Sequence, residues 1–280
     1  MLAIDGKKIA AEIITRLTSL PKPKKFFAGI LIGDDPASAS FQALKQKTAV
    51  ELGIDYRIYR LAPELGNDGL REEVGNIARQ KTCGGVIVQL PVPAPLNKHY
   101  IINAIPKEKD PDVLSEHSLG SFYAGRNPVL QPAAATVEEI LRVQKFELKG
   151  KKVAVVGPGF LVGRPVAMWL IGKATEVYVL NRGGDMSVLK HMDLVVSGVG
   201  SAHLINQSML KNGVGIIDFG YARKDAPADG EISDQLVGDF DPTPAQGDKE
   251  IDGWYAPVPG GTGPIAVAKL FENFYTLNKN

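Results

Sequence analysis

The residues of this 280-residue chain best suited to chemistry form a glycine-rich turn near its middle. The apolar run Val153–Val156 predicts a strand, and Gly157-Pro158-Gly159 follows it directly. Gly157 permits a tight turn, and Gly159 lets the backbone approach a pyrophosphate at the N-terminus of the next helix. Gly163 comes one place later than the third glycine of G-x-G-x-x-G, so an ordinary strand–helix turn is the alternative interpretation.

The next predicted strand ends in Asn181-Arg182, where an NAD enzyme would carry an acidic residue for the ribose hydroxyls. An arginine can instead pair with a 2′-phosphate through charge-assisted hydrogen bonds. The residues therefore favour NADP over NAD. The alternative interpretation of Arg182 is a solvated surface cation.

A lysine and an amide form a second candidate group. Phe41 and Lys45 are four residues apart on a predicted helix, so they share one of its faces. Taken alone, a lysine on a helix is most often solvated. Gln89 ends a predicted buried strand before Leu90-Pro91, and its amide can donate and accept hydrogen bonds, although it also fits a simple cap of the turn. An amine whose pKa is lowered by burial is suited to general acid–base catalysis.

The elements that must position these residues alternate between strands and helices. Helices are predicted over 9–17, 38–52, 70–80, 136–143, 162–171 and 263–277, and strands over 26–32, 56–61, 84–90, 152–156, 176–180, 194–197 and 214–219. Strands separated by helix-length segments predict an α/β protein with a mostly parallel sheet. The polar, proline-rich stretch 106–132 predicts a long loop at the edge between two domains.

Composition excludes several classes of function. Hydrophobic residues make up 44% of the chain and the net charge is +1, without a basic stripe, so neither nucleic acid nor an anionic membrane is expected as a partner. The apolar runs are too short to span a bilayer, and the first residues do not resemble a secretory leader, so we expect a cytoplasmic enzyme. The four histidines lack metal-binding spacing and Cys83 is alone, so no metal is expected.

Taken in their order and spacing, these segments resemble the bifunctional methylenetetrahydrofolate dehydrogenase/cyclohydrolase family over essentially the whole chain. The most specific segment is the octet Pro257–Pro264, followed by Val88–Pro91 and Val162–Pro165. The resemblance implies two α/β domains around a cleft, in a homodimer. The N-terminal folate-binding catalytic domain would cover residues 1–134 and be completed by the C-terminal helix 263–280. A Rossmann-type NADP-binding domain would cover residues 135–262.

The resemblance also implies an activity: NADP-dependent oxidation of methylenetetrahydrofolate to methenyltetrahydrofolate, followed by hydrolysis to 10-formyltetrahydrofolate. Tetrahydrofolate derivatives would be the substrates and NADP the cofactor. By their positions in the family's motifs, the implied catalytic residues are Lys45, Gln89 and Asp112, and the substrate-binding residues are Phe41, Pro259, Gly260, Gly261 and Pro264. The implied cofactor-binding residues are Gly157, Pro158, Gly159, Arg182 and Tyr221.

Departures from the family pattern keep other hypotheses open. Phe41 stands where the family usually has a tyrosine, and Ala133–Ala135 replaces most of a P-C-T-P stretch near the cofactor. One alternative is a non-catalytic or partially active paralogue that binds folate or dinucleotide. Another is a different NADP-dependent reductase, of the shikimate dehydrogenase-like type, which would leave the Pro257–Pro264 octet unexplained.

Overall fold

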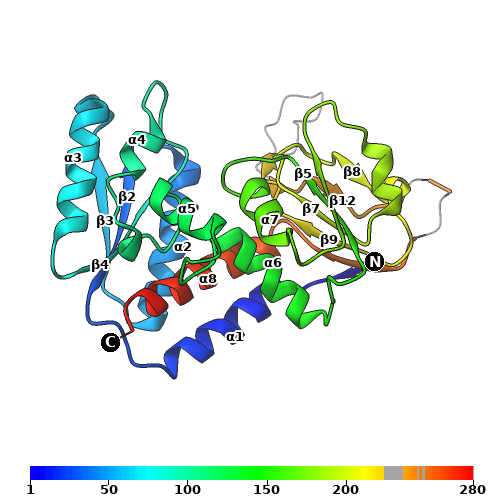
Figure 1. Ribbon diagram of the computed structural model, residues 1–280, viewed down its shortest axis with the longest axis horizontal. Coiled ribbons are helices and arrows are strands. Elements are labelled where there is room, and N and C mark those ends of the chain that lie inside the picture. Colours follow the sequence, from blue (N-terminus) through cyan, green and yellow to red (C-terminus); the bar gives the residue numbers. More distant parts are fainter. Residues whose placement is uncertain (224–235, 245, 248–249, 280) are drawn as a thin grey trace. The chain divides into compact units, whose positions relative to one another are not determined.

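The computed structural model describes residues 1–223, 236–244, 246–247 and 250–279. The chain divides into two compact units (Figure 1). One consists of Ala10–Pro132 with Val267–Asn280 and holds a three-stranded sheet. The other consists of Met1–Ile9 with Ala133–Ala266 and holds a six-stranded sheet. We call them the three-stranded and the six-stranded unit.

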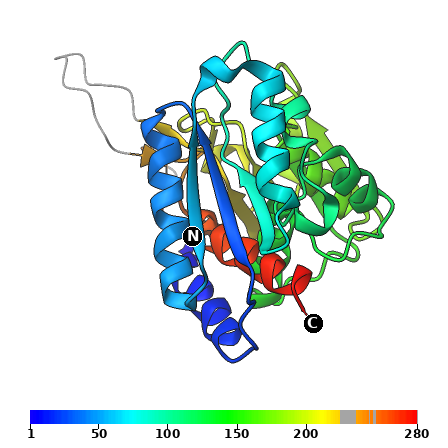
Figure 2. The same ribbon diagram turned by 90° about the vertical axis from the view of Figure 1, so that its left-hand side faces the viewer.

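In the three-stranded unit, β2 (Phe26–Ile32) lies between β3 (Tyr56–Leu61) and β4 (Cys83–Val88), and all strands are parallel. Every residue of β2 and β4 is buried, as the continuous apolar runs predict for a parallel sheet. Helix α2 (Pro36–Leu52) packs along β2 and β3 (Figure 2), and α3 (Gly66–Arg79) packs against β4.

The C-terminal part of α8 (Thr262–Leu277) completes this unit. The ring of Phe274 stacks on that of Phe27 in β2, with centroids 4.5 Å apart and the planes at 5°. Phe271 meets the same ring edge-on, with centroids 5.5 Å apart. Helix α8 is therefore part of the aromatic core against which the central strand β2 packs.

The six-stranded unit has the strand order β1-β13-β9-β7-β5-β6, with all strands parallel. These strands are β1 (Leu2–Ala3), β5 (Lys152–Val156), β6 (Glu176–Leu180), β7 (Leu194–Ser197), β9 (Val214–Asp218) and β13 (Gly253–Ala256). The chain runs from β5 to β6 on one side and then to β7 on the other, so the strand order reverses beside β5. Open α/β sheets bind ligands at such a switch point, outside the carboxyl ends of the strands.

The remaining elements are short or flank the sheets. They are the helices α1 (Gly6–Thr18), α4 (Lys98–Ile102), α5 (Glu116–Tyr123), α6 (Pro132–Val143) and α7 (Gly163–Leu170); the strands β8 (Ile205–Asn206), β10 (Ala222–Arg223), β11 (Leu236–Val237) and β12 (Phe240–Asp241); and the 3₁₀ turns η1 (Pro63–Leu65), η2 (Lys107–Lys109), η3 (Met186–His191) and η4 (Gln207–Met209). None of the helices that the structure describes is both long and apolar enough to cross a membrane.

The α/β class with a parallel sheet is confirmed. Residues 1–9 group with the six-stranded unit because β1 pairs with β13, and the domain bounds 1–134 and 135–262 stay a prediction. One other sequence prediction needs correction. The stretch 106–132 is not a simple loop, since it contains η2 and α5. Helix α5 begins there because the hydroxyl of Ser115 accepts a hydrogen bond from the backbone N–H of Ser118, and because Val113 and Leu114 are buried.

Candidate active site

The structure brings Lys45 and Gln89 together in the three-stranded unit. Lys45 lies on α2, one turn after Phe41, and its amine donates a hydrogen bond of 2.7 Å to Oε1 of Gln89. Gln89 directly follows β4, where its backbone N–H donates to the carbonyl of Ile30 at 2.8 Å. Its Nε2 donates to the carbonyl of Leu90 at 2.9 Å, which leaves the side-chain carbonyl turned toward the amine. The amide therefore has a fixed orientation beside Lys45.

The pKa of the Lys45 amine is lowered from its ordinary value. Burial is the main cause, because it disfavours the charged form, and the negative charge of Asp112 opposes it. Phe41, on the same helix face, adds an apolar ring that cannot accept a hydrogen bond. An amine of lowered pKa that is held by a neutral amide gives up its proton more readily than an ordinary lysine, which suits it to general acid–base catalysis.

Asp112 follows the buried Asp110 with one proline between them, and the two carboxylates differ in their surroundings. Asp110 is 1% exposed and accepts hydrogen bonds from the backbone N–H groups of Ser115 at 2.8 Å and Leu114 at 3.1 Å. Asp112 makes no hydrogen bond with any residue in the part of the chain that the structure describes. Burial raises the pKa of Asp112 to about 6; the charge of Lys45 lowers it and that of Asp110 raises it. Its oxygens are thus available to a ligand.

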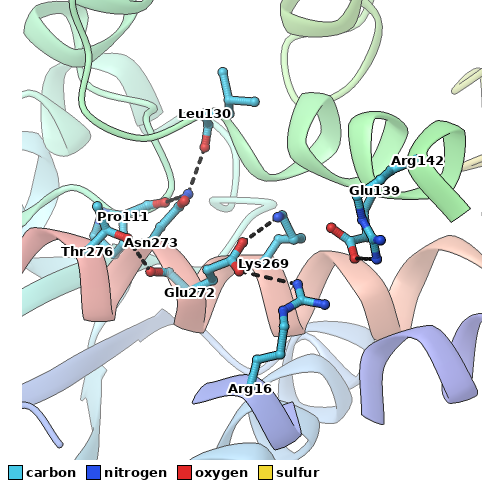
Figure 3. A network of polar contacts seen from close by, with 9 residues as sticks. All are labelled: Arg16, Pro111, Leu130, Glu139, Arg142, Lys269, Glu272, Asn273 and Thr276. Atoms are coloured by element: carbon cyan, nitrogen blue, oxygen red, sulfur yellow. Dashed lines mark hydrogen bonds and ion pairs between the residues drawn. The ribbon is translucent and has the colours of Figure 1, made fainter. Parts of the chain in front are cut away.

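A side chain of α8 fixes the peptide that carries Asp112 (Figure 3). Nδ2 of Asn273, which is 5% exposed, donates to the carbonyl of Pro111 at 2.8 Å and to that of Leu130 at 2.7 Å. One turn of the same helix carries Glu272, paired with Lys269 and, at 3.5 Å, with Arg16. Sequence reasoning missed Asn273; the available signal was a polar residue within the apolar face of the last helix.

A second polar group lies next to Phe41 on α2. Gln42 is 2% exposed, and its Oε1 accepts a hydrogen bond of 2.5 Å from the hydroxyl of Tyr56 in β3. A Cβ on Gly29 of β2 would lie 2.1 Å from that hydroxyl oxygen, so only glycine leaves room for the pair. Nε2 of Gln42 is buried without a hydrogen-bond partner among the described residues. The pKa of Tyr56 is raised, first by burial and then by the charge of Asp112, so its hydroxyl stays protonated.

The glycine turn follows β5 at the switch point of the six-stranded sheet. Gly157 has φ +81°, and its N–H donates to the carbonyl of Leu180 at the end of β6. A Cβ on Gly163 would lie 2.1 Å from the carbonyl oxygen of Gly157, so α7 begins with glycine because it packs directly on the turn. A Cβ on Gly159 would meet nothing closer than 3.9 Å. Packing within the chain does not require glycine at 159, and the open space there lets a ligand reach the backbone.

The other residues expected at a cofactor lie around the same edge of the sheet. Pro158 is part of the turn, and Arg182 is an exposed residue two positions beyond the carbonyl of Leu180 that holds Gly157. Tyr221 follows β9 and is 42% exposed. Arg182 thus follows β6, the neighbour of β5, and Tyr221 follows β9, one strand beyond β7.

The Pro257–Pro264 octet connects β13 to α8 in the six-stranded unit, up to the first residues of that helix. Pro259, Gly260 and Gly261 lie in one tight turn, in which the N–H of Gly261 donates to the carbonyl of Pro257 at 2.8 Å. Gly260 has φ +97°, which favours glycine. Thr262 then donates its hydroxyl to the carbonyl of Asp218 at 2.7 Å, which ties the octet to β9. Pro264 lies in the first turn of α8.

No group of three or more histidine, cysteine, aspartate or glutamate side chains in the described ranges could hold a metal ion.

Two family models match the chain. Residues 4–112 match the tetrahydrofolate dehydrogenase/cyclohydrolase catalytic domain, and residues 131–280 match the NAD(P)-binding domain of the same family. The chain is 33% identical over 284 aligned positions to the bifunctional protein FolD of Lactobacillus delbrueckii subsp. bulgaricus, covering 99% of this chain and 96% of the relative.

Solved structures agree with these matches. The FolD dehydrogenase/cyclohydrolase of Campylobacter jejuni has a TM-score of 0.89 and 29% identity, over 99% of this chain and 98% of that one. The Trypanosoma brucei dehydrogenase-cyclohydrolase, solved with NADP cofactor and an inhibitor, has a TM-score of 0.87 and 27% identity, over 99% of this chain and 96% of that one.

Proposed function

Because the chain belongs to the tetrahydrofolate dehydrogenase/cyclohydrolase family, we propose that it is a bifunctional enzyme of folate one-carbon metabolism. It oxidises methylenetetrahydrofolate to the methenyl cation with NADP, and it then hydrolyses this cation to 10-formyltetrahydrofolate. Membership of this family removes the shikimate dehydrogenase-like interpretation. Divergence at Phe41 affects the surroundings of Lys45 but leaves Lys45, Gln89 and Asp112 in place.

The observation that carries this proposal is the hydrogen bond between the Lys45 amine and Gln89. The carboxylate of Asp112 accepts no hydrogen bond among the described residues, and its negative charge raises the pKa of that amine. Hydrolysis of the methenyl cation adds water to the bridge carbon and then transfers a proton to the leaving ring nitrogen. The Lys45 amine takes the proton from water and gives it to the nitrogen. Gln89 holds the amine through its fixed carbonyl oxygen, and it stays neutral throughout.

Asp112 and Phe41 bind the substrate in this proposal. The ring of the folate head group offers N–H donors, and the free oxygens of Asp112 can accept them. The phenyl ring of Phe41 can stack on the same aromatic system without a hydrogen bond. The octet residues Pro259, Gly260, Gly261 and Pro264 also contribute to substrate binding, on the strength of the family resemblance.

NADP fits the residues around the glycine turn. Gly159 leaves open space over the backbone, α7 presents its N-terminus to an anion, and Arg182 is an exposed cation that can reach a 2′-phosphate. When bound, NADP supplies the hydride acceptor. Gly157, Pro158 and Gly159 would hold the pyrophosphate, and Tyr221 would contribute to binding the nicotinamide.

We further propose a homodimer located in the cytoplasm, on the strength of the family resemblance. The N-terminal catalytic domain would cover residues 1–134 with the C-terminal helix 263–280, and the NADP domain residues 135–262. Sedimentation of the purified protein at micromolar concentration tests the dimer. A particle of the monomer mass of 30.1 kDa would contradict it.

Purified full-length protein tests the activity directly. We expect methylenetetrahydrofolate to drive NADP reduction. In a separate assay without any cofactor, we expect the protein to make methenyltetrahydrofolate disappear faster than it does in buffer alone. Absence of both reactions, in a protein that still binds folate or NADP, would favour the non-catalytic paralogue instead.

A further inference from the structure

Two buried carboxylates of the six-stranded unit have no part in the chemistry above. Asp218 ends β9 and is 2% exposed, and Asp239 directly precedes β12 and is fully buried. Neither is hydrogen-bonded to Lys45 or Gln89. Carboxylates are seldom buried without partners, so their hydrogen bonds indicate what they do.

Among the described residues, the side chain of Asp239 accepts hydrogen bonds from one short segment, residues 197–201, at the carboxyl end of β7. Its Oδ2 accepts from the hydroxyl of Ser197 at 2.5 Å and from the N–H of Val199 at 2.8 Å. Its Oδ1 accepts from the N–H of Ser201 at 2.8 Å. A single buried carboxylate thus holds the hydroxyl at the end of β7 and two backbone donors of the loop that follows it.

This segment interlocks with the glycine turn. A Cβ on Gly157 would lie 2.8 Å from Cγ2 of Val199. A Cβ on Gly198 would in turn lie 2.8 Å from Cγ1 of Val162, just before α7. The backbone at Gly157 thus packs against the side chain of Val199, and the backbone at Gly198 packs against that of Val162. Neither place has room for one more carbon. A shift of the segment 197–201 must move the glycine turn or the start of α7 as well.

Asp218 supports the peptide that carries Asp239. Its Oδ2 accepts from the N–H of Phe240 at 2.8 Å, and its Oδ1 accepts from the N–H of Gly220 at 2.7 Å. A Cβ on Gly238 would lie 2.1 Å from Oδ2 of Asp218, so the chain around Asp239 passes directly over this carboxylate. The position of Asp239 is therefore fixed from its own side as well.

We propose that Asp239 is a positioning residue for NADP binding, acting through the segment 197–201 on the Gly157–Gly159 turn. The inference rests on the proposed function, in which that turn binds the pyrophosphate. A carboxylate suits this task because it offers only acceptors, and all three groups that face it are donors. An asparagine in its place would turn an NH₂ group toward at least one of these donors, leaving that donor unpaired and pushing the segment away from Asp239.

Isothermal titration of the full-length protein with NADP tests the inference, with methenyl hydrolysis measured separately without cofactor. We expect Asp239→Asn to weaken NADP binding at least about tenfold, because a charge-assisted hydrogen bond is lost. Hydrolysis, which needs no NADP, should stay within about twofold of the parent rate at saturating substrate. A merely structural role would lower NADP affinity and the hydrolysis rate together. Equal NADP affinity in parent and variant, or a parallel loss of NADP affinity and hydrolysis, would overturn the inference.

Two further variants keep the test decisive. Ser197→Ala removes only the hydroxyl bond to Asp239, so it should weaken NADP binding by a smaller factor, about two- to fivefold, even if Asp239→Asn does not fold. Asp110→Asn is the matched control, since Asp110 is an equally buried carboxylate of the other unit, and it should leave NADP affinity unchanged. An unchanged affinity in Ser197→Ala, or a loss in Asp110→Asn equal to that in Asp239→Asn, would contradict the inference. If the parent does not bind NADP at all, the proposed cofactor is wrong and the inference falls with it.

Discussion

The aspartates of the two units differ in the hydrogen bonds that they accept. In the six-stranded unit, the oxygens of Asp218 and Asp239 are occupied by backbone N–H groups and a serine hydroxyl. In the three-stranded unit, Asp110 is bonded in the same manner, whereas Asp112 makes no hydrogen bond among the described residues and faces the charge of Lys45. A saturated carboxylate fixes a loop. A partly exposed carboxylate such as Asp112, without a hydrogen bond among the described residues, keeps its oxygens open to a ligand.

The same contrast separates the two reactions. In the proposed function, hydrolysis would depend on two ionisable side chains whose pKa values are shifted by burial, Lys45 and Asp112. Cofactor binding would instead depend on the backbone around Gly157 and Gly159, where the absence of a side chain leaves the backbone accessible. The variants below are chosen to affect one of these regions and spare the other.

The largest expected effect comes from Lys45→Met, which keeps most of the apolar stem and removes the amine. Methenyl hydrolysis should fall at least about a hundredfold, because general acid–base catalysis typically contributes a hundredfold to ten-thousandfold. Hydride transfer needs no proton from Lys45, so the dehydrogenase should survive in part and NADP affinity should be unchanged. Steady-state assays of both reactions check this. Hydrolysis at the parent rate would make Lys45 a surface lysine without a catalytic role.

The next largest effect is expected from Arg182→Ala in the six-stranded unit. Loss of the charge-assisted contact to the 2′-phosphate should weaken NADP by roughly tenfold to a hundredfold, while NAD should be affected little. Dissociation constants for both cofactors provide the measurement. If NADP and NAD weaken equally, the 2′-phosphate assignment is wrong.

Asp112→Asn should separate stability from activity. The pKa of Asp112 lies at about 6 in the folded protein, above its ordinary 3.8, so the folded state binds the proton more tightly. Its contribution to stability is present below pH 3.8 and is lost as the pH rises through about 6. The neutral asparagine avoids this loss, so the variant should be more stable than the parent by about 1 to 3 kcal/mol near pH 8, with the difference shrinking toward pH 4.

Thermal unfolding at several pH values measures that difference, and the KM for folate should rise in the same variant. Asp239→Asn is the natural comparison, since removal of a saturated carboxylate should destabilise the protein. If Asp112→Asn lowers the melting temperature near pH 8 as Asp239→Asn does, the contrast between the two carboxylates fails.

The smallest effect is expected at the Tyr56–Gln42 pair. Tyr56→Phe leaves both ends of the buried Gln42 amide unpaired, which should cost about 1 to 2 kcal/mol of unfolding free energy. The double variant Gln42→Leu/Tyr56→Phe removes both polar partners and should recover that loss. Tyr59→Phe, the same change on the other face of β3, is the control and should cost less. Denaturant titration checks all three; a double variant less stable than Tyr56→Phe would contradict the account.

The sequence predicted those parts of the fold whose signal is local. Continuous apolar runs gave β2, β4 and β5, and the glycine turn with Arg182 lay in one stretch of chain. Helix α5 was missed because its capping residue Ser115 stands in a proline-rich stretch that resembles a loop. The pairing of β1 with β13 joins residues far apart in the sequence, Leu2 with Trp254, so no local pattern predicts it.

The parts of the site that could not be predicted depend on contacts between distant residues. Asn273 holds Pro111 and Leu130 across more than a hundred residues of sequence. Asp110 and Asp112 carry identical side chains two positions apart, so only the backbone donors that reach Asp110 distinguish them. The hydrogen bond between Gln42 and Tyr56 depends on the space that Gly29 leaves in β2. The spacing of residues along the sequence does not predict that space.

The central claim is that burial lowers the pKa of the Lys45 amine, so that this amine can transfer a proton during methenyl hydrolysis. Its titration can be followed directly by NMR in protein labelled at the lysine side-chain carbons, with the signal assigned by its loss in Lys45→Met. We predict an apparent pKa below the ordinary 10.5, and a further decrease in Asp112→Asn, because the negative charge of Asp112 raises it. An amine that titrates at or above 10.5, with no response to Asp112→Asn, would contradict the account.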